Sequence, residues 1–287
     1  ARALGGDDVG PAFHHGPCPR FAEFIGKVGV FQAGNAAPAA AGAGVFEFHH
    51  AYPRPCGKFP AHGAAHMGIE AEVARVVHGD DKGMVRARRD FLERGHYAPL
   101  REALQALAVS CAPPARADVL DAGCGECYYT AAVEQALLES GRETSVVGVD
   151  ISKDALRFGD KRGRALRLAV ASAYRLPVAD VSCDLVLNVF APFAGGEFRR
   201  VLRCGGAVLH VSPGERHLWE LKEAVYERPY LNDAPAPVQE GLEPAGEQRL
   251  AYPIALNSNR EIVDLFCMTP YVHKTGSGDM ARLQALH

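Results

Sequence analysis

The chain lacks any uninterrupted apolar run of 18 or more residues, so the sequence offers no membrane span. It also lacks an excess of charge of one sign: 31 Lys and Arg stand against 34 Asp and Glu, a formal net charge of −3. This balance excludes a general polyanion-coating protein, and any nucleic-acid contact must come from a local basic patch. Eight cysteines in 287 residues are too sparse for a disulfide scaffold. With no basic-then-apolar leader at the N-terminus, we expect a cytoplasmic protein.

The composition changes near residue 79, which predicts two regions. Residues 1–78 hold seven of the twelve histidines, together with seven prolines and twelve glycines. A zinc module needs paired ligands two to four residues apart, whereas Cys18 and Cys56 each stand alone here. We therefore expect 1–78 to be an irregular Gly/Pro/His-rich extension without a zinc module or other metal site, and 79–287 to be the folded domain.

The region after residue 79 alternates short apolar runs with helix-compatible stretches. The runs are rich in branched residues and are almost continuously apolar, as buried parallel strands are. They are Val119-Leu120, Val146 to Val149, Leu166 to Val170, Leu185 to Val189 and Ala207 to Val211. Helices are expected over Met84 to Arg94, from Pro99 through Leu107, and over Tyr129 to Ser140, Lys153 to Arg162 and Glu197 to Leu202. This alternation predicts an α/β doubly wound, mostly parallel sheet.

A glycine loop between the first of these runs and the next helix carries the most specific signal. Gly123 and Gly125 allow a sharp turn and a close approach of the backbone to a ligand. A dinucleotide fingerprint would have a third glycine where Tyr128 stands. Instead Asp121 precedes the loop, where it can hold an ammonium group, and Asp150 ends the next strand, where it can accept ribose hydroxyls. Two acids in these places indicate S-adenosylmethionine rather than a dinucleotide.

From about Gly79 to Leu286 the chain resembles the bacterial large-subunit ribosomal RNA (guanine-N1)-methyltransferases, which are class I, Rossmann-like S-adenosylmethionine enzymes. The glycine loop alone would indicate only a methyltransferase. Two further runs narrow the family: Ala87-Arg88-Arg89-Asp90-Phe91-Leu92 and Pro213-Gly214-x-Arg216-His217-Leu218. Shorter matches are Gly95-His96-Tyr97, Gly148 to Lys153, Arg175-Leu176-Pro177, Ala191-Pro192 and Met268-Thr269-Pro270.

The resemblance implies which residues contact the cofactor. They are Tyr97, Gly125, Glu126 and His217. Ser172, just after the third strand, is a candidate for the adenine edge. The resemblance also implies methyl transfer to N1 of a guanine in large-subunit ribosomal RNA, with that RNA as the partner.

The acceptor is expected beside the end of the fourth predicted strand. There Phe190 can stack on a guanine, with Asn188 or a nearby carbonyl at its edge and Pro192 adjoining. The basic helix supplies an RNA-backbone patch that includes Arg88 and Arg89. Removal of the N1 proton requires a base, but the sequence identifies no catalytic residue: His217 and Asp184 are both open.

The sequence departs from the family pattern in three places. The N-terminal zinc module is absent, Cys127 replaces the usual glycine of the loop, and the chain stops before the last strand. A missing last strand predicts a gap or an unpaired edge in the sheet. Two alternatives therefore stay open, a small-molecule methyltransferase and a non-catalytic remnant of the fold. A homodimer is also left open.

Overall fold

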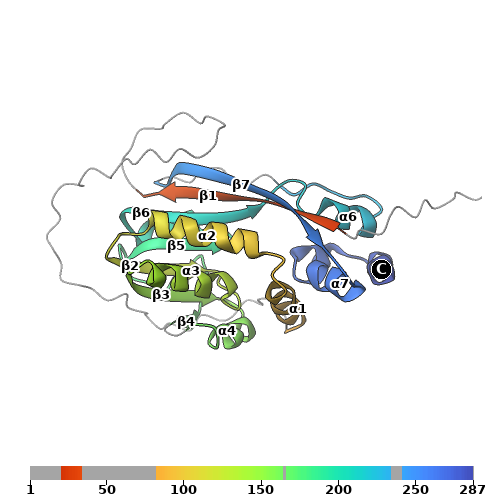
Figure 1. The fold of residues 1–287 in the computed structure, drawn as a ribbon, viewed down its shortest axis with the longest axis horizontal. Coiled ribbons are helices and arrows are strands. Elements are labelled where there is room, and N and C mark those ends of the chain that lie inside the picture. The colour runs from red at the N-terminus through yellow and green to blue at the C-terminus, as the bar shows by residue number, and fades with distance from the viewer. Residues whose placement is uncertain (1–20, 34–81, 164–165, 234–240, 287) are drawn as a thin grey trace, which may run out of the picture.

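A computed structural model describes residues 21–33, 82–163, 166–233 and 241–286 (Figure 1). Within them one seven-stranded sheet has the order β4-β3-β2-β5-β6-β1-β7. The strands are β1 (Phe21–Gln32), β2 (Arg116–Ala122), β3 (Glu143–Asp150), β4 (Arg167–Val170), β5 (Cys183–Val189), β6 (Leu202–Pro213) and β7 (Glu243–Ala255). The helices are α1 (Lys82–Glu93), α2 (Ala98–Cys111), α3 (Tyr128–Glu139), α4 (Lys153–Gly159), α5 (Gly195–Val201), α6 (Trp219–Val225), α7 (Asn259–Cys267), the 3-10 helix η1 (Pro270–Lys274) and α8 (Ser277–Ala285).

The doubly wound architecture confirms the predicted fold. Each of the five predicted apolar runs overlaps a strand, β2 to β6, and each neighbouring pair among these strands is parallel. Helices α1 to α5 overlap the five predicted helices. The chain leaves β2 towards β3 and β4 on one side, and reaches β5 and β6 on the other. The switch point between β2 and β5 is where ligands of open α/β sheets bind.

Strand β1 corrects the expectation for the N-terminal region. Residues 1–78 were expected to be an irregular extension, yet Phe21–Gln32 lies inside the sheet, antiparallel to both β6 and β7. Its ladder with β6 runs from Gly26–Pro213 to Gln32–Ala207. The position beside β6 that a lost last strand would leave open is therefore filled by an N-terminal strand. The remaining residues of 1–78, with Cys18 and Cys56, lie outside the described residues.

Two apolar clusters cover the two faces of the sheet. On one face, side chains of β1, β2, β5 and β6 pack against α2 and α3, with Leu104 and Leu137 fully buried. On the other face, Val186 and Val208 pack against Phe198 of α5. Alternate residues of β1, Ala22, Phe24, Val28 and Val30, belong to the first cluster. This period of two explains why β1 is stable as a strand although it contains two glycines.

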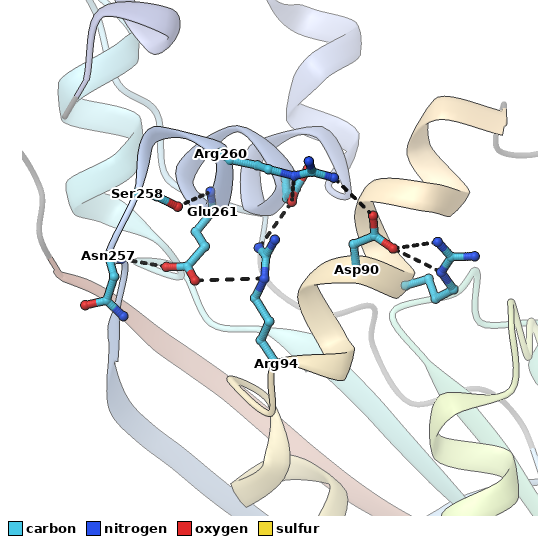
Figure 2. Close-up of polar contacts among 8 residues, drawn as sticks. Asp90, Arg94, Asn257, Ser258, Arg260 and Glu261 are labelled. Atoms are coloured by element: carbon cyan, nitrogen blue, oxygen red, sulfur yellow. Dashed lines mark hydrogen bonds and ion pairs between the residues drawn. The ribbon is translucent and has the colours of Figure 1, made fainter.

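Helices α1 and α7 lie side by side at one end of the molecule (Figure 1) and are joined by ion pairs (Figure 2). The Arg94 guanidinium lies 3.2 Å from Asp264 and 3.9 Å from Glu261, and Arg260 lies 3.5 Å from Asp90. Exposed pairs of this kind stabilise by about 0–1 kcal/mol each, so the network orients α1 more than it stabilises the fold. These ion pairs also neutralise positive charge on the basic helix that the sequence predicted to contact the RNA backbone.

No helix in the described part of the chain is long and apolar enough to cross a membrane. Among these same residues, no group of three or more His, Cys, Asp or Glu side chains is placed to hold a metal ion.

Candidate functional site

A cavity of about 1380 Å³ opens at the carboxyl ends of the parallel strands. Single-ligand pockets commonly measure about 300–1,000 Å³, so this one has room for two ligands side by side. The glycine loop and Asp150 form one part of its wall, and the segment after β5 and the loop before η1 form another. The cavity thus lies at the switch point and joins the two halves of the predicted site.

Asp121 is buried at the end of β2, where its two carboxylate oxygens differ. Oδ2 accepts a hydrogen bond of 2.6 Å from the Thr130 hydroxyl, while Oδ1 has no hydrogen-bond partner among the described residues. Burial raises the pKa of Asp121 to about 7, and the nearby Asp150 carboxylate contributes. A buried carboxylate with one unmatched oxygen on a cavity wall fits a cationic ligand group such as the ammonium of S-adenosylmethionine.

Asp150 holds the glycine loop against the sheet. Its Oδ2 accepts the Gly125 N–H at 2.9 Å and its Oδ1 accepts the Ser152 N–H at 2.7 Å. A carboxylate oxygen can accept more than one hydrogen bond, and this position at the end of β3 suits ribose hydroxyls. The Gly125 N–H is therefore engaged by Asp150, and we infer that Gly125 serves the site by lacking a side chain where the loop borders the cavity.

The loop itself adopts a conformation that needs glycine at one place and tolerates cysteine at another. At Gly123, φ is +98° and an added Cβ would lie 2.4 Å from the Ala191 Cβ, so only glycine lets these segments approach. Cys127 also has a positive φ, 64°, as the N-cap residue of α3. Its thiol packs against Gly159 of α4, and Cys127 does not line the cavity. Cysteine in place of the family's glycine therefore strains the backbone without blocking the cofactor position.

Replacing this cysteine should hardly affect cofactor binding. For Cys127→Gly we expect an affinity for S-adenosylhomocysteine within about threefold of wild type, because the thiol points away from the cavity. Gly123→Ala is the matched control, and we expect it to weaken binding by about tenfold or more because its new methyl group collides with Ala191. Calorimetric titration measures both. Equal losses of affinity in the two variants would show that Cys127, like Gly123, borders the bound cofactor.

Tyr97 and His217 form one wall with the N-terminal strand. The Phe24 ring packs edge-on against both, at centroid distances of 4.9 and 5.0 Å. The Ile25 N–H donates to His217 Nδ1 at 3.2 Å, so Nδ1 is unprotonated and Nε2 carries the proton of the neutral ring. Burial lowers the pKa of His217 to about 3. His217 is thus a neutral hydrogen-bond donor and not a base.

Phe190 and Pro192 follow β5 and line the cavity. Phe190 has a positive φ of 53° and its side chain is 41% exposed on the cavity wall. A left-handed conformation at a bulky residue costs about 1–3 kcal/mol and is found at functional sites. Its ring lies at 6.1 Å from that of His217, nearly parallel to it. The geometry presents an aromatic face to a second ligand.

Asn188 does not line the cavity, whereas we expected it or a nearby carbonyl to meet the edge of the acceptor. It is fully buried, and its Nδ2 donates to the carbonyls of Ala122 and Pro192 at 3.0 and 3.2 Å. Its Oδ1 lies 2.7 Å from His210 Nδ1. Because these partners use the whole amide, Asn188 holds the segment after β5 and orients His210.

The other predicted residues divide between the cavity wall and the surface. Glu126 and Ser172 line the cavity. Arg88 also lines it and donates to the Met268 carbonyl at 3.1 Å. Arg89 does not line it, since its guanidinium pairs with Asp90 at 2.7 Å and lies over the Phe158 ring.

Asp184 lies outside the cavity and is excluded as a base there. Its carboxylate accepts the Asp118 N–H at 2.9 Å and pairs with Arg203 at 2.8 Å, next to the beginning of β5. The parallel strands bring their carboxyl ends to the cavity, so a residue at their amino ends cannot reach it.

Sequence reasoning missed Phe24, His210, Asn232 and Tyr271. The last three line the cavity, and Phe24 lies directly behind its aromatic wall. A signal existed for two of them. His210 is the single polar residue in the apolar run Ala207 to Val211, and Phe24 belongs to a short alternating apolar pattern. Asn232 and Tyr271 carry no local signal, because contacts between distant parts of the chain bring them together. Asn232 Oδ1 accepts hydrogen bonds from Lys222 Nζ and from the Tyr271 hydroxyl.

Comparison with known proteins agrees with this geometry. A family model described as "Methyltransferase domain" matches residues 119–210. A Micromonospora griseorubida protein, "Putative 23S rRNA (guanine-N(1)-)-methyltransferase", is 36% identical over 227 residues, 72% of this chain and 74% of that protein. The 23S rRNA (guanine(748)-N(1))-methyltransferase of Streptomyces fradiae is 38% identical over 51% of both chains. This chain thus spans about three quarters of the first relative and half of the second.

Among solved structures, an S-adenosylmethionine-dependent methyltransferase of Methanococcus maripaludis covers 46% of this chain and 65% of its own, at 18% identity and a TM-score of 0.37. A methyltransferase of Geobacter sulfurreducens with bound S-adenosylhomocysteine covers 37% and 46%, at 19% identity and a TM-score of 0.31.

Proposed function

The chain belongs to the 23S rRNA (guanine-N1)-methyltransferase family, and on that premise we propose that it transfers a methyl group from S-adenosylmethionine to N1 of a guanine in large-subunit ribosomal RNA. The observation that carries the proposal is that the residues suited to the cofactor and those suited to a base line one and the same cavity. A pair of acids suited to the cofactor lies on one wall, and an exposed aromatic residue with a strained backbone, Phe190, on another.

The cofactor supplies an activated methyl group on sulfur, so the protein's part is binding, orientation and the exclusion of water. Asp121 Oδ1 would accept the ammonium group, and Asp150 would accept the ribose hydroxyls. Tyr97, His217 and Glu126 on the loop line the same cavity and would contact the cofactor. Ser172 lies on the wall that would meet the adenine.

The target guanine would stack on Phe190, with Pro192 beside it. Stacking of a base on an aromatic side chain contributes about 1–3 kcal/mol. N1 lies on the pairing edge of guanine, so the base must come from a loop or be flipped out of its helix. The exposed Phe190 ring suits an unstacked base, because a paired base would present neither its face nor its N1 atom.

Methyl transfer to RNA tests the proposal directly. Large-subunit ribosomal RNA lacking the modification is incubated with the protein and labelled S-adenosylmethionine, and the digested nucleosides are separated by mass spectrometry. We expect 1-methylguanosine, and Phe190→Ala should reduce its formation by about tenfold or more. A parallel reaction with a metabolite extract tests the small-molecule alternative, while S-adenosylhomocysteine titration tests the non-catalytic one. Label in metabolites alone, or no cofactor binding, would overturn the proposal.

The basic helix makes a narrower prediction about RNA. Arg88→Ala should weaken RNA binding and reduce the slope of log K against log salt by about 1, because a cavity-wall guanidinium loses a phosphate contact. Arg89→Ala is the matched control and should leave the slope unchanged, since Asp90 neutralises that guanidinium. Filter binding at several salt concentrations measures both, with cofactor affinity as a check. A lower slope for Arg89→Ala alone would reverse the assignment.

A ribosomal RNA substrate also implies a cytoplasmic reaction. This follows from the substrate, and recovery of the native protein with ribosome precursors in cell fractions would support it.

A further inference from the structure

The proposed reaction must remove a proton from guanine N1, and His210 offers a site for it. His210 lies on β6 opposite Asn188 of β5, and it lines the same cavity as Phe190 and Pro192. Its ring packs edge-on against Phe193 at 4.8 Å and lies 6.5 Å from Phe31 of β1. The strand pairing and these rings fix the imidazole in place.

Hydrogen bonding determines which ring nitrogen of His210 carries the proton. Asn188 Nδ2 donates to two carbonyls, which can only accept, so the orientation of the Asn188 amide is fixed. Asn188 Oδ1 then faces His210 Nδ1 at 2.7 Å and must accept a hydrogen bond from it, so Nδ1 carries the proton. In the neutral ring Nε2 is therefore the unprotonated nitrogen. This is the reverse of His217, whose Nδ1 accepts from the Ile25 backbone.

On this basis, and on the proposed function, we propose that His210 Nε2 is the general base that takes the proton from guanine N1. The N1–H bond breaks, and its electron pair forms the bond from N1 to the methyl carbon. The carbon–sulfur bond breaks towards sulfur, leaving a neutral thioether. The proton on Nε2 then passes to solvent, so the positive charge of the sulfonium leaves as a proton.

The surroundings of His210 keep the ring unprotonated near neutral pH. Burial lowers its pKa, opposed by the bond to Asn188. The elements packed against the ring contribute uncharged groups among the described residues: Asn188 from β5, Gly29 and Phe31 from β1, and Phe193 from the loop. The titratable groups elsewhere on the cavity wall include Arg88, Asp121, Asp150, Arg175, His217 and His273. Of these, His273 is the rival base, exposed on η1.

The test compares His210→Gln and His273→Gln with wild type in single-turnover methyl transfer at saturating cofactor and RNA. General-base catalysis contributes about 10²- to 10⁴-fold, so His210→Gln should slow the reaction by at least about 10²-fold. Without a base the reaction depends on the small ionised fraction of guanine, so the rate of His210→Gln should rise about tenfold per pH unit between pH 6 and 8. The wild-type rate should rise less steeply there, because the pKa of His210 is lowered by burial, and His273→Gln should follow wild type.

Two readouts separate catalysis from structure. Free imidazole should accelerate His210→Ala, because it restores a base in the vacated space. The nitrogen chemical shifts of His210 in the ligand-free protein should show a proton on Nδ1. Wild-type synthesis of 1-methylguanosine with an unchanged pH profile in His210→Gln, or transfer of the effect to His273→Gln, would overturn this inference and leave the proposed function standing. Absence of 1-methylguanosine from the wild-type reaction would instead overturn the proposed function.

Discussion

Phe24→Ala should lower the free energy of unfolding by about 3–5 kcal/mol, although the residue lies far from the rest of the domain in sequence. The Phe24 ring is fully buried and stacks on Tyr252 of β7 at a centroid distance of 4.6 Å. It also contacts Tyr97 and His217 on the cavity wall. Its loss would leave a cavity between the sheet and the site. Denaturant unfolding followed by fluorescence measures the effect.

A second substitution separates the stability of the fold from the geometry of the site. Phe24→Leu keeps most of the apolar volume, so it should cost about 1–1.5 kcal/mol in stability. Methyl transfer should nevertheless fall by about 10- to 100-fold, because Tyr97 and His217 lose the ring that positions them. Val30→Ala, on the same face of β1 but away from these rings, should reduce stability with little change in rate. A free energy of unfolding of Phe24→Ala within about 1 kcal/mol of the wild-type value would contradict the burial of Phe24 in the sheet.

The sequence predicts the parallel half of this sheet because its strands are buried on both faces. Leu185 to Val189 and Ala207 to Val211 are each apolar except for one residue, and such runs can be recognised as strands without knowledge of their partners. β1 and β7 are antiparallel, and β7 alternates between exposed and half-buried residues over most of its length. Whether such a strand joins a given sheet depends on a partner distant in the chain. The position of β1 was therefore not predictable from local pattern, although its alternating residues were visible.

The residues of the site also fall into those that the sequence predicts and those that it does not. Asp121, Gly123 and Asp150 were predictable because one loop and two adjacent strand ends bring them together locally. The Asn188–His210 pair depends on the register between β5 and β6, which the sequence does not state. The same holds for the basic helix: its arginines suggested an RNA surface, while the structure pairs Arg94, just after α1, with α7 (Figure 2). Arg88 lines the cavity. Local motifs predict which residues hold a ligand, and tertiary contacts decide which side chains remain available.

Cofactor affinity should depend on pH through Asp121. Burial raises the pKa of this carboxyl to about 7 in the ligand-free protein, whereas an ammonium group binds only the ionised form. Affinity for S-adenosylhomocysteine should therefore fall by about tenfold from pH 8 to pH 6, as the carboxyl takes up a proton that binding must expel. Calorimetric titration in buffers of different ionisation enthalpy measures both the affinity and the proton released.

Two variants test whether Asp121 causes this dependence. Asp121→Asn should remove the pH dependence and weaken binding at pH 8 by about 10²-fold or more, because leaving a buried ammonium group without its carboxylate costs about 3–5 kcal/mol. Thr130→Val deletes a hydrogen bond that lowers the pKa of Asp121, so the decline in affinity should begin at a higher pH. A pH dependence that persists in Asp121→Asn would assign the titration to another group.

The same shift has the opposite sign for the stability of the ligand-free protein. The folded-state pKa of Asp121 lies above its value in the unfolded chain, so between about pH 4 and pH 7 the folded state binds more protons. Stability contributed by this residue is therefore present at low pH and is lost as the pH rises through 7. Asp121→Asn should accordingly unfold at a higher temperature than wild type at pH 8. The buried acid thus destabilises the empty protein under the conditions in which it binds the cofactor, because the desolvation that raises its pKa is relieved only when a cation arrives.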